Sequence, residues 1–268
     1  MGGRVVGGLE WVLWAVVVLS FACGRPDEGY LFVTNRGDEA VFAATQLREV
    51  SRGANMTLLS DAATLRDVGS AASVFDVVLS AEVAMPDLDV HDSMGFRLQK
   101  LRGMLHSPYE RTIYMDSDTF SCKSPEELFR VLERSAADMA CVWGGRGNHS
   151  GASAGVLAYR KSAASDALWR AWERIYRDVM ASTRREQPSF QKAVKEAVGG
   201  SGLGVVKLPM TYNCRNVRHC RAATLKDATR VDGCVVIRAT QGCFNYTSTR
   251  VFERSDMCQE RPIHLSRP

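Results

Sequence analysis

Two aspartates at the end of an apolar run are the residues best suited to chemistry. Asp116 and Asp118 are separated by Ser117 and follow Thr112–Met115, a run that predicts a buried strand. Ligands bind at the carboxyl ends of strands in open α/β sheets. Two carboxylates on the turn that leaves such a strand can converge on one divalent cation, and hard oxygen ligands suit Mg²⁺ or Mn²⁺. A cation there could hold a diphosphate and neutralise charge that develops on a leaving group.

The same spacing also occurs in plain turns, where aspartate side chains accept hydrogen bonds from backbone amides. The flanking sequence favours a ligand site, because the pair precedes Ser124–Glu127. There Ser as the N-cap, Pro at the first position and Glu three residues after the cap predict a helix start. Haloacid-dehalogenase-like phosphatases also use an acidic pair, as nucleophile and general acid. They need a later pair of adjacent acidic residues for magnesium, and this sequence contains no Asp-Asp.

The elements around the pair predict a three-layer α/β fold with a mostly parallel central sheet, because strands alternate with helices. Apolar runs predict strands at Tyr30–Asn35, Met56–Leu59, Phe75–Leu79, Thr112–Met115, Met139–Val142 and Gly155–Tyr159. Amphipathic segments predict helices at Asp38–Arg52, Phe96–Leu105, Ser162–Met180 and Gln187–Val198. A glycine-rich loop is expected over Val198–Gly204, followed by short strands near Val205–Leu208 and Cys234–Arg238.

The composition is that of an ordinary globular protein. Of the 268 residues, 46% are hydrophobic and 24% are charged, which excludes disordered, collagen-like and low-complexity chains. The net charge of +4 comes from mixed positive and negative residues and is too small to indicate nucleic-acid binding.

Residues 1–24 have the character of a signal peptide or a signal anchor. The uncharged run Trp11–Cys23 is preceded by Arg4 and followed by Arg25. Because the run is shorter than a usual membrane span, it favours a signal peptide, and an uncleaved anchor over Val5–Gly24 is the second possibility. One folded domain with a Cys-rich C-terminal part is predicted for residues 29–268.

Cysteines and sequons also favour the secretory pathway. Five of the eight cysteines fall in the last 55 residues and none forms a CxxC pair, so disulfides are favoured over zinc binding, with buried free thiols as the alternative. Asn-x-Ser/Thr acceptors for N-glycosylation occur at Asn55, Asn148 and Asn245. These features predict a protein of the ER or Golgi lumen or membrane, or a secreted one.

Several motifs resemble those of GT-A-fold glycosyltransferases, such as the glycogenin-like group that uses nucleotide-sugar donors. Lys100–Thr119 (KLRGMLHSPYERTIYMDSDT) is similar to the donor-site block of these enzymes, with a Lys, an apolar helix, a Ser-Pro-aromatic turn and a strand ending in Asp-x-Asp-Thr. Further similar segments follow in the family's order, at Ser124–Phe129, Ala154–Arg160, Glu186–Phe190 and Pro209–Arg215. The resemblance covers roughly residues 30–242.

The resemblance implies transfer of a sugar from a nucleotide-diphosphate donor, with a UDP-sugar favoured, to an acceptor hydroxyl on a glycan, protein or lipid. Asp118 would be a direct ligand of Mn²⁺ or Mg²⁺, and Asp116 would bind the metal or the donor ribose. Ser117 between them would also contact the donor. Thr34 and Asn35 would line the nucleotide pocket.

On the sugar side, the resemblance implies that Lys100 and Arg97 meet the donor phosphates or sugar. Gln187 would face the sugar or the attacking acceptor, and Ser153 and Gly155 would lie beside the sugar. Lys100 and Gln187 are therefore the expected catalytic residues. From the residues alone, Lys100 and Arg97 could equally be solvated helix charges, and Gln187 could cap its helix.

Two departures from the family pattern bear on activity. Arg238 stands where the family has a histidine that ligates the metal; arginine binds phosphate bidentately but does not ligate metals. Arg238 could therefore replace part of the histidine's work, the cation could have only carboxylate and phosphate ligands, or the site could be degraded. Ser153-Ala154 replaces the family's Asn-Ser, which removes an amide near the sugar.

Three questions remain open at this stage. A general base cannot be chosen from Glu186, Asp227 and Asp232, so the stereochemistry of transfer is open. A catalytically inactive sugar- or nucleotide-binding protein on the same fold is the main alternative. A sugar nucleotidyltransferase is a second alternative, but its Gly-rich phosphate loop is not matched by the sequence after Asn35.

Overall fold

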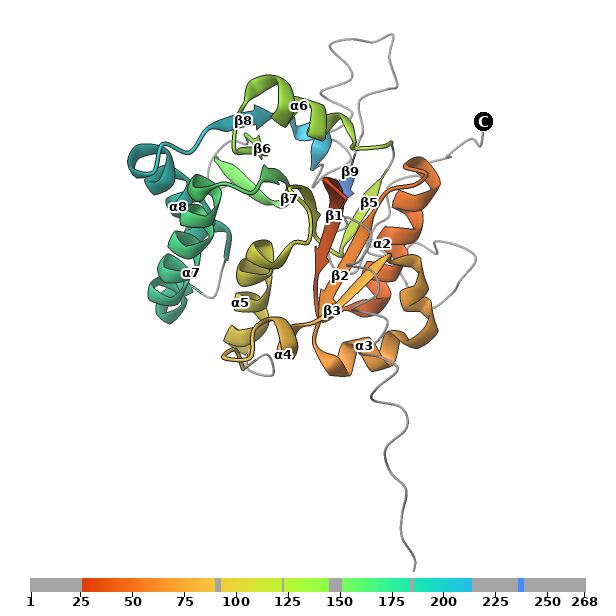
Figure 1. Cartoon of the computed structure of the whole chain (residues 1–268). Helices are drawn as coiled ribbons and strands as arrows, with labels where there is room; N and C mark the ends of the chain where they lie inside the picture. The colour runs from red at the N-terminus through yellow and green to blue at the C-terminus, as the bar shows by residue number, and fades with distance from the viewer. Residues whose placement is uncertain are drawn as a thin grey trace, which may run out of the picture.

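Helices cover both faces of a central sheet (Figure 1). The computed structural model describes residues 26–89, 93–121, 123–144, 151–183, 186–213 and 236–238. The predicted leader, residues 1–24, lies outside this part of the chain. Within it, no helix combines the length and the apolar character needed to cross a membrane.

The central sheet has seven strands in the order β3-β2-β1-β4-β7-β6-β8. Their bounds are β1 Glu28–Val33, β2 Met56–Ser60, β3 Val77–Ser80, β4 Arg111–Met115, β6 Met139–Trp143, β7 Ala152–Arg160 and β8 Val205–Leu208. The pairs β2–β3, β1–β2, β1–β4 and β6–β8 are parallel, and β7 runs antiparallel to both of its neighbours. The predicted mostly parallel α/β sheet is confirmed.

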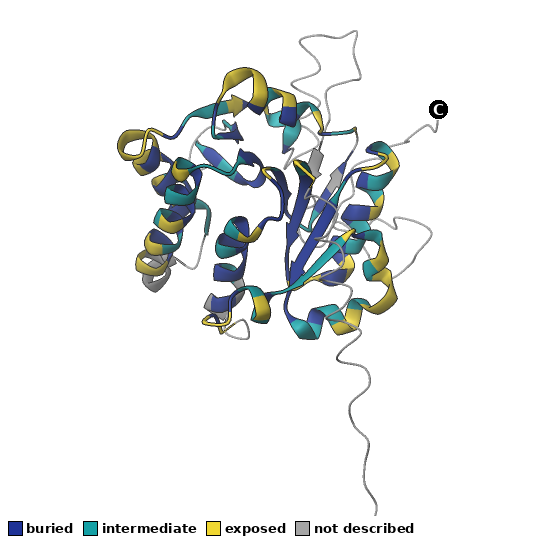
Figure 2. Ribbon diagram, in the orientation of Figure 1, coloured by how far each residue is buried: buried dark blue, intermediate teal, exposed yellow. Residues whose placement is uncertain are grey.

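Two layers of helices form because side chains alternate between the faces along each strand. The helices are α2 Gly37–Val50, α3 Ala62–Val68, α4 Ala81–Ala84, α5 Ser93–Gly103, α6 Glu127–Ser135, α7 Ala163–Thr183 and α8 Glu186–Gly200. On β1, Tyr30 and Phe32 join the core cluster that contains residues of α2 and α6, whereas Leu31 and Val33 join the cluster of α5, α7 and α8. The sheet is consequently buried on both faces (Figure 2).

The expected core role of the two tryptophans in α7 is confirmed. Trp169 and Trp172 are fully buried, and Trp172 Nε1 donates a hydrogen bond to Ser189 Oγ of α8 over 3.0 Å. The ring centroids of Trp169 and Tyr159 lie 4.9 Å apart, and those of Trp172 and Phe190 lie 4.6 Å apart. This packing fixes α7 and α8 against β7, and it therefore fixes the start of α8 relative to the sheet.

A second, two-stranded sheet lies beyond the end of β4 and was not predicted. It pairs β5 Thr119–Ser121 antiparallel with β9 Val236–Arg238, with Thr119 opposite Arg238. The predicted strand near residues 234–238 is confirmed for 236–238. The pairing brings the backbone of Arg238 beside the residue that follows Asp118.

The predicted helix start at Ser124 is wrong. Helix α6 begins at Glu127, its cap position is Glu126, and no side chain caps it. Ser124 lies two residues before that cap position, and its hydroxyl accepts hydrogen bonds from Ser51 Oγ at 2.6 Å and from the Glu126 amide at 3.3 Å. Helix α8 also runs to Gly200, two residues beyond the predicted helix end at Val198.

Cys141 is the one cysteine in the described part of the chain. Its thiol is free and buried in β6, and burial raises the pKa of that thiol to about 12. The thiol is therefore protonated and unreactive at neutral pH. The other seven cysteines, and with them the predicted disulfides, lie outside the described residues.

Candidate functional site

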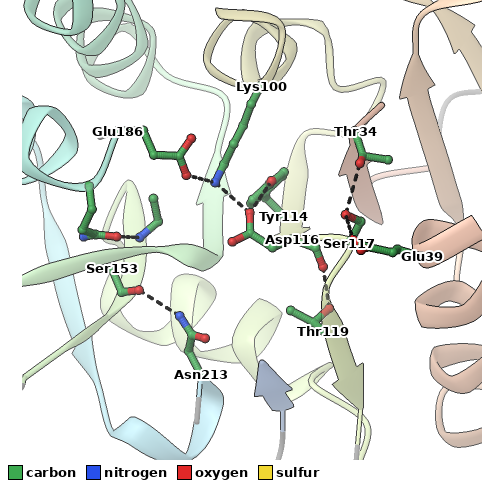
Figure 3. Close-up of polar contacts among 12 residues, drawn as sticks. Thr34, Glu39, Lys100, Tyr114, Asp116, Ser117, Thr119, Ser153, Glu186 and Asn213 are labelled. Atoms are coloured by element: carbon green, nitrogen blue, oxygen red, sulfur yellow. Dashed lines mark hydrogen bonds and ion pairs between the residues drawn. The ribbon is translucent and has the colours of Figure 1, made fainter. Parts of the chain in front are cut away.

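Polar side chains from four elements meet at the carboxyl end of β4 (Figure 3). Asp116 leaves β4, Lys100 comes from α5, Glu186 begins α8, and Thr34 follows β1. Because β1 and β4 are parallel neighbours, their carboxyl ends lie side by side. The predicted acidic pair thus lies at the carboxyl end of the strands, where ligands bind in open α/β folds.

Lys100 is the centre of a buried ionic network. Its Nζ donates hydrogen bonds to Asp116 Oδ1 and to Glu186 Oε1, each over 2.7 Å. The side chains of Lys100 and Asp116 are each only 9% exposed, so the pair is shielded from bulk solvent. Charge-assisted hydrogen bonds of this kind are strong, and removing one partner leaves a buried charge uncompensated. Lys100 is therefore not the solvated helix charge that the sequence alone allowed.

Tyr114 completes this network from the strand itself. Its hydroxyl donates to Asp116 Oδ1 over 2.7 Å, and Lys100 Nζ lies 5.2 Å from its ring centroid. Alternation along β4 explains the arrangement, because Tyr114 points to the face covered by α5 whereas its neighbours Ile113 and Met115 point to the other face. The sequence reasoning missed Tyr114, although its place two residues before Asp116 was a usable signal.

The backbone of Asp116 is fixed on both sides. Its amide donates to the Gly155 carbonyl of β7 over 2.9 Å, and its carbonyl accepts from Thr119 Oγ1 over 2.7 Å. Gly155 therefore lies directly beside the acidic motif, while its expected place beside the sugar stays a prediction. These bonds hold the turn that carries Asp118, whose side chain is half-buried.

Ser117 points the other way, towards β1 and α2. Thr34 Oγ1 donates to Ser117 Oγ over 3.1 Å, and Ser117 Oγ donates to Glu39 Oε2 over 3.1 Å. Arg36 binds the other oxygen of Glu39, also over 3.1 Å. Glu39 was missed in the sequence because it reads as an ordinary acidic residue in the first turn of a helix. Asn35 is exposed beside this group, and its carbonyl accepts from Thr64 Oγ1.

Gln187 and Asn213 contact β7 where it passes the site. Gln187 Nε2 donates to the Ala152 carbonyl, and the Ala154 amide donates to Gln187 Oε1 over 3.3 Å. Asn213 Nδ2 donates to Ser153 Oγ over 2.8 Å. Gln187 thus bridges two backbone groups of β7, which is a different contact from the helix cap allowed by the sequence.

Two further predicted residues are described only in part. Arg97 lies three residues before Lys100 on α5, so the two share a helix face, and Arg97 is half-buried. Arg238 is placed by its backbone pairing with Thr119, and its side chain lies outside the description.

The acidic pair fits a hard divalent cation by the chemistry of its oxygens. Magnesium in such sites is held by one or two carboxylates and completed by substrate phosphates and water. Asp116 and Asp118 supply that number of carboxylates. Among the described residues, no group of three or more His, Cys, Asp or Glu side chains is arranged to hold a metal. A cation held by these two carboxylates would take further oxygens from a bound substrate or from water.

No protein-family model and no curated protein matches the sequence. Solved structures do match the fold. The apo form of mouse xyloside xylosyltransferase 1 aligns with a TM-score of 0.50 and 13% identity, over 80% of this chain and 98% of that one. The glycosyltransferase GlyE of Streptococcus pneumoniae TIGR4 aligns with a TM-score of 0.56 and 14% identity, over 82% of this chain and 56% of that one.

At such low identities a likeness establishes the fold. The resemblance that the sequence motifs indicated is confirmed at that level: the chain has the GT-A glycosyltransferase fold.

Proposed function

We propose that this protein is a glycosyltransferase that moves a sugar from a nucleotide-diphosphate donor, with a UDP-sugar favoured, to an acceptor hydroxyl. The observation that carries the proposal is the acidic turn at the end of β4, with Asp116 bonded to a buried Lys100 on one side and Ser117 bonded to Thr34 and Glu39 on the other. The GT-A fold, on which solved glycosyltransferases are built, supports it.

In this proposal Asp118 and Asp116 hold Mn²⁺ or Mg²⁺. When bound, the cation would neutralise charge on the departing diphosphate. Lys100 is fixed between two carboxylates, so its ammonium is oriented before the donor arrives, and such preorganisation is the main source of electrostatic catalysis. Lys100 would meet a donor phosphate or the sugar, with Arg97 on the same helix face.

The donor's nucleoside and sugar would lie on opposite sides of the acidic turn. The hydroxyls of Thr34 and Ser117 and the carboxylate of Glu39 offer donors and acceptors to a ribose or a base. On the sugar side, Gly155 belongs to β7, and Gln187 bonds to the backbone of that strand. Gln187 would act by fixing the position of β7 beside the sugar.

Glu186 would act as a positioning residue for Lys100. Of the three acidic residues considered as a general base, it is the one within the described part of the chain, and it bonds to Lys100 over 2.7 Å. This contact ties the Glu186 carboxylate to the Lys100 ammonium, which supports a role in orienting Lys100.

We further propose that the protein acts in the lumen or at the membrane of the ER or Golgi, or after secretion. The support is the apolar leader and the three glycosylation acceptors in the sequence. The acceptor at Asn55 is a poor candidate in the folded protein, because Asn55 Nδ2 donates to the Glu28 carbonyl and Thr57 is fully buried. Asn148 and Asn245 are the better candidates for glycans.

The experiment is a donor panel with the full chain. Release of UDP or GDP from UDP- and GDP-sugars would be measured with Mn²⁺ for the wild type, Asp118→Asn and Asp87→Asn. Asp87 is a matched control, because this surface aspartate bonds to Arg102, away from the turn. We expect release with one nucleotide class, a loss of about 100- to 1000-fold in Asp118→Asn, and little change in Asp87→Asn.

Two results would contradict the proposal. Equal release by Asp118→Asn and the wild type would mean that the acidic turn is not the reacting site. Binding of a nucleotide-sugar without any release or transfer would instead support the inactive binding protein on the same fold.

A further inference from the structure

Asn213 has a buried amide oxygen that this part of the fold leaves unused. The residue follows the short helix Met210–Tyr212 and is only 1% exposed. Its Nδ2 donates to Ser153 Oγ over 2.8 Å, while its Oδ1 accepts no hydrogen bond from any residue that the structure describes. Burying an acceptor without a donor costs stability, so native proteins rarely keep one without a reason.

The place of Asn213 suggests that reason. Its partner Ser153 lies on β7 between the two backbone groups held by Gln187. Two residues further along β7, the Gly155 carbonyl accepts from the Asp116 amide. Figure 3 shows Ser153 and Asn213 together in the same close-up region as the Lys100–Asp116 network.

Enclosure of Asn213 is no obstacle to ligand contact at this site. Asp116 and Lys100 are also enclosed, with 6% and 7% of the whole residue exposed. Both are residues that the proposed function requires to meet the donor or its cation. Limited access is therefore a common property of the polar groups here.

The family resemblance also bears on this pair. The motif that residues 153–157 resemble has Asn where this chain has Ser153, and Pro209–Arg215, which contains Asn213, is similar to a second segment of the same family. Serine has a hydroxyl but no amide, so in this chain the amide of Asn213 bonds to a hydroxyl on β7.

We propose that Asn213, anchored by Ser153, is a specificity-determining residue of the donor-sugar subsite. Its Nδ2 is held by the Ser153 hydroxyl, and its Oδ1 accepts a hydrogen bond from a hydroxyl of the donor sugar. This inference rests on the proposed function. A site built to bond a hydroxyl discriminates strongly against ligands that lack it, because its buried polar group is then left unpaired.

The test separates the sugar from the nucleotide. Dissociation constants would be measured by calorimetry with Mn²⁺ for UDP, UDP-glucose, UDP-galactose and UDP-xylose. The quantity of interest is the ratio of the constant for the best-bound UDP-sugar to the constant for UDP. For Asn213→Leu, which keeps the size but removes both polar atoms, we expect UDP binding within about twofold and a ratio raised about tenfold.

A swapped variant guards against a simple folding defect. Ser153→Asn combined with Asn213→Ser returns the amide to β7 and keeps a hydroxyl–amide pair. We expect it to recover the wild-type ratio within about threefold. A ratio unchanged in Asn213→Leu, or one that the swap fails to recover, would overturn the role of Asn213.

The two proposals fail in distinguishable ways. If the wild type binds UDP and a UDP-sugar but Asn213→Leu weakens both equally, the donor site stands and the sugar-specific role of Asn213 is wrong. If the wild type binds neither UDP nor any of the three UDP-sugars, the UDP-sugar donor fails, and the inference about Asn213 fails with it.

Discussion

Lys100 and Arg102 lie two residues apart on α5, and each bridges two carboxylates. Lys100 bonds to Asp116 and Glu186, whereas Arg102 donates to Glu173 over 2.8 and 3.0 Å and to Asp87 over 2.6 Å. Each cluster combines one positively charged side chain with two carboxylates. They differ in which elements supply the acidic partners.

The partners of Lys100 come from the end of β4 and the start of α8. They lie at the carboxyl end of the strands, where ligands bind in folds of this class. The partners of Arg102 come from the middle of α7 and from the segment after α4, and Asp87 is 69% exposed. Arg102 therefore ties two helices together, while Lys100 holds a carboxylate that a cation or substrate would contact. Charge pairing alone does not distinguish a ligand-binding site from a structural ion pair. The position of the charged group at the end of a strand does.

The largest expected difference between the clusters is in turnover. Lys100→Met should lower donor release by about 100- to 1000-fold, because it removes the oriented ammonium from the acidic turn. Arg102→Met should stay within about threefold of the wild type. The two rates would be compared by steady-state assay with Mn²⁺, with circular dichroism to confirm that both variants are folded. Similar losses of donor release in both variants would contradict the assignment of different roles to Lys100 and Arg102.

The second difference is in stability. Arg102→Met removes two hydrogen bonds to the half-buried Glu173 carboxylate and one to the exposed Asp87 carboxylate, and we expect the free energy of unfolding to fall by about 1–3 kcal/mol. Arg134→Met on α6 is the matched control, because Arg134 is 71% exposed and its pair with Glu127 should contribute about 0–1 kcal/mol. Urea unfolding measures both. A loss in Arg134→Met equal to that in Arg102→Met would contradict the bracing role.

The smallest effect is a pH dependence that belongs to the Arg102 cluster. Burial alone would raise the pKa of the Glu173 carboxyl, but hydrogen bonds and charge from Arg102 and Arg177 outweigh it and hold that pKa below its usual value of 4.5. The contribution of Glu173 to stability is therefore complete above that usual value, and it is lost as pH falls through the lowered pKa.

The comparison of wild type with Glu173→Gln by urea unfolding between pH 3 and 7 checks this sign. We expect the stability gap between the two proteins to be widest above about pH 5 and to narrow on acidification. A gap that widened as the pH fell would mean that Glu173 is not held ionised by its arginine partners.

Sequence alone was sufficient for the strands of the sheet and for the acidic turn. Buried strands such as Tyr30–Val33 and Thr112–Met115 are short apolar runs, and that signal is local. The acidic pair could be placed at a strand end because it follows one of these runs directly. The family resemblance added the roles of the residues, and the structure supports the fold behind that resemblance.

The rest depended on contacts between distant segments. Strand β5 has three residues, and it is a strand only because Val236–Arg238 pairs with it. Lys100 was expected near the donor, but its bond to Glu186, 86 residues away, carries no sequence signal. Helix α6 begins at Glu127 and not at Ser124, whose hydroxyl bonds to Ser51 of another segment and to the Glu126 amide.

The most direct test of the account is a thermal-shift titration of the full chain with UDP and GDP, with and without Mn²⁺. The wild type, Asp118→Asn and Arg102→Met would be compared. At about 100 times its dissociation constant, a ligand stabilises the fold by roughly 2.7 kcal/mol, which for a chain of this size is a rise of roughly 5 °C or more. We predict a metal-dependent rise with one nucleotide that Asp118→Asn loses and Arg102→Met keeps. No rise with either nucleotide at millimolar concentration, or a rise that Asp118→Asn leaves unchanged, would contradict a donor site at the end of β4.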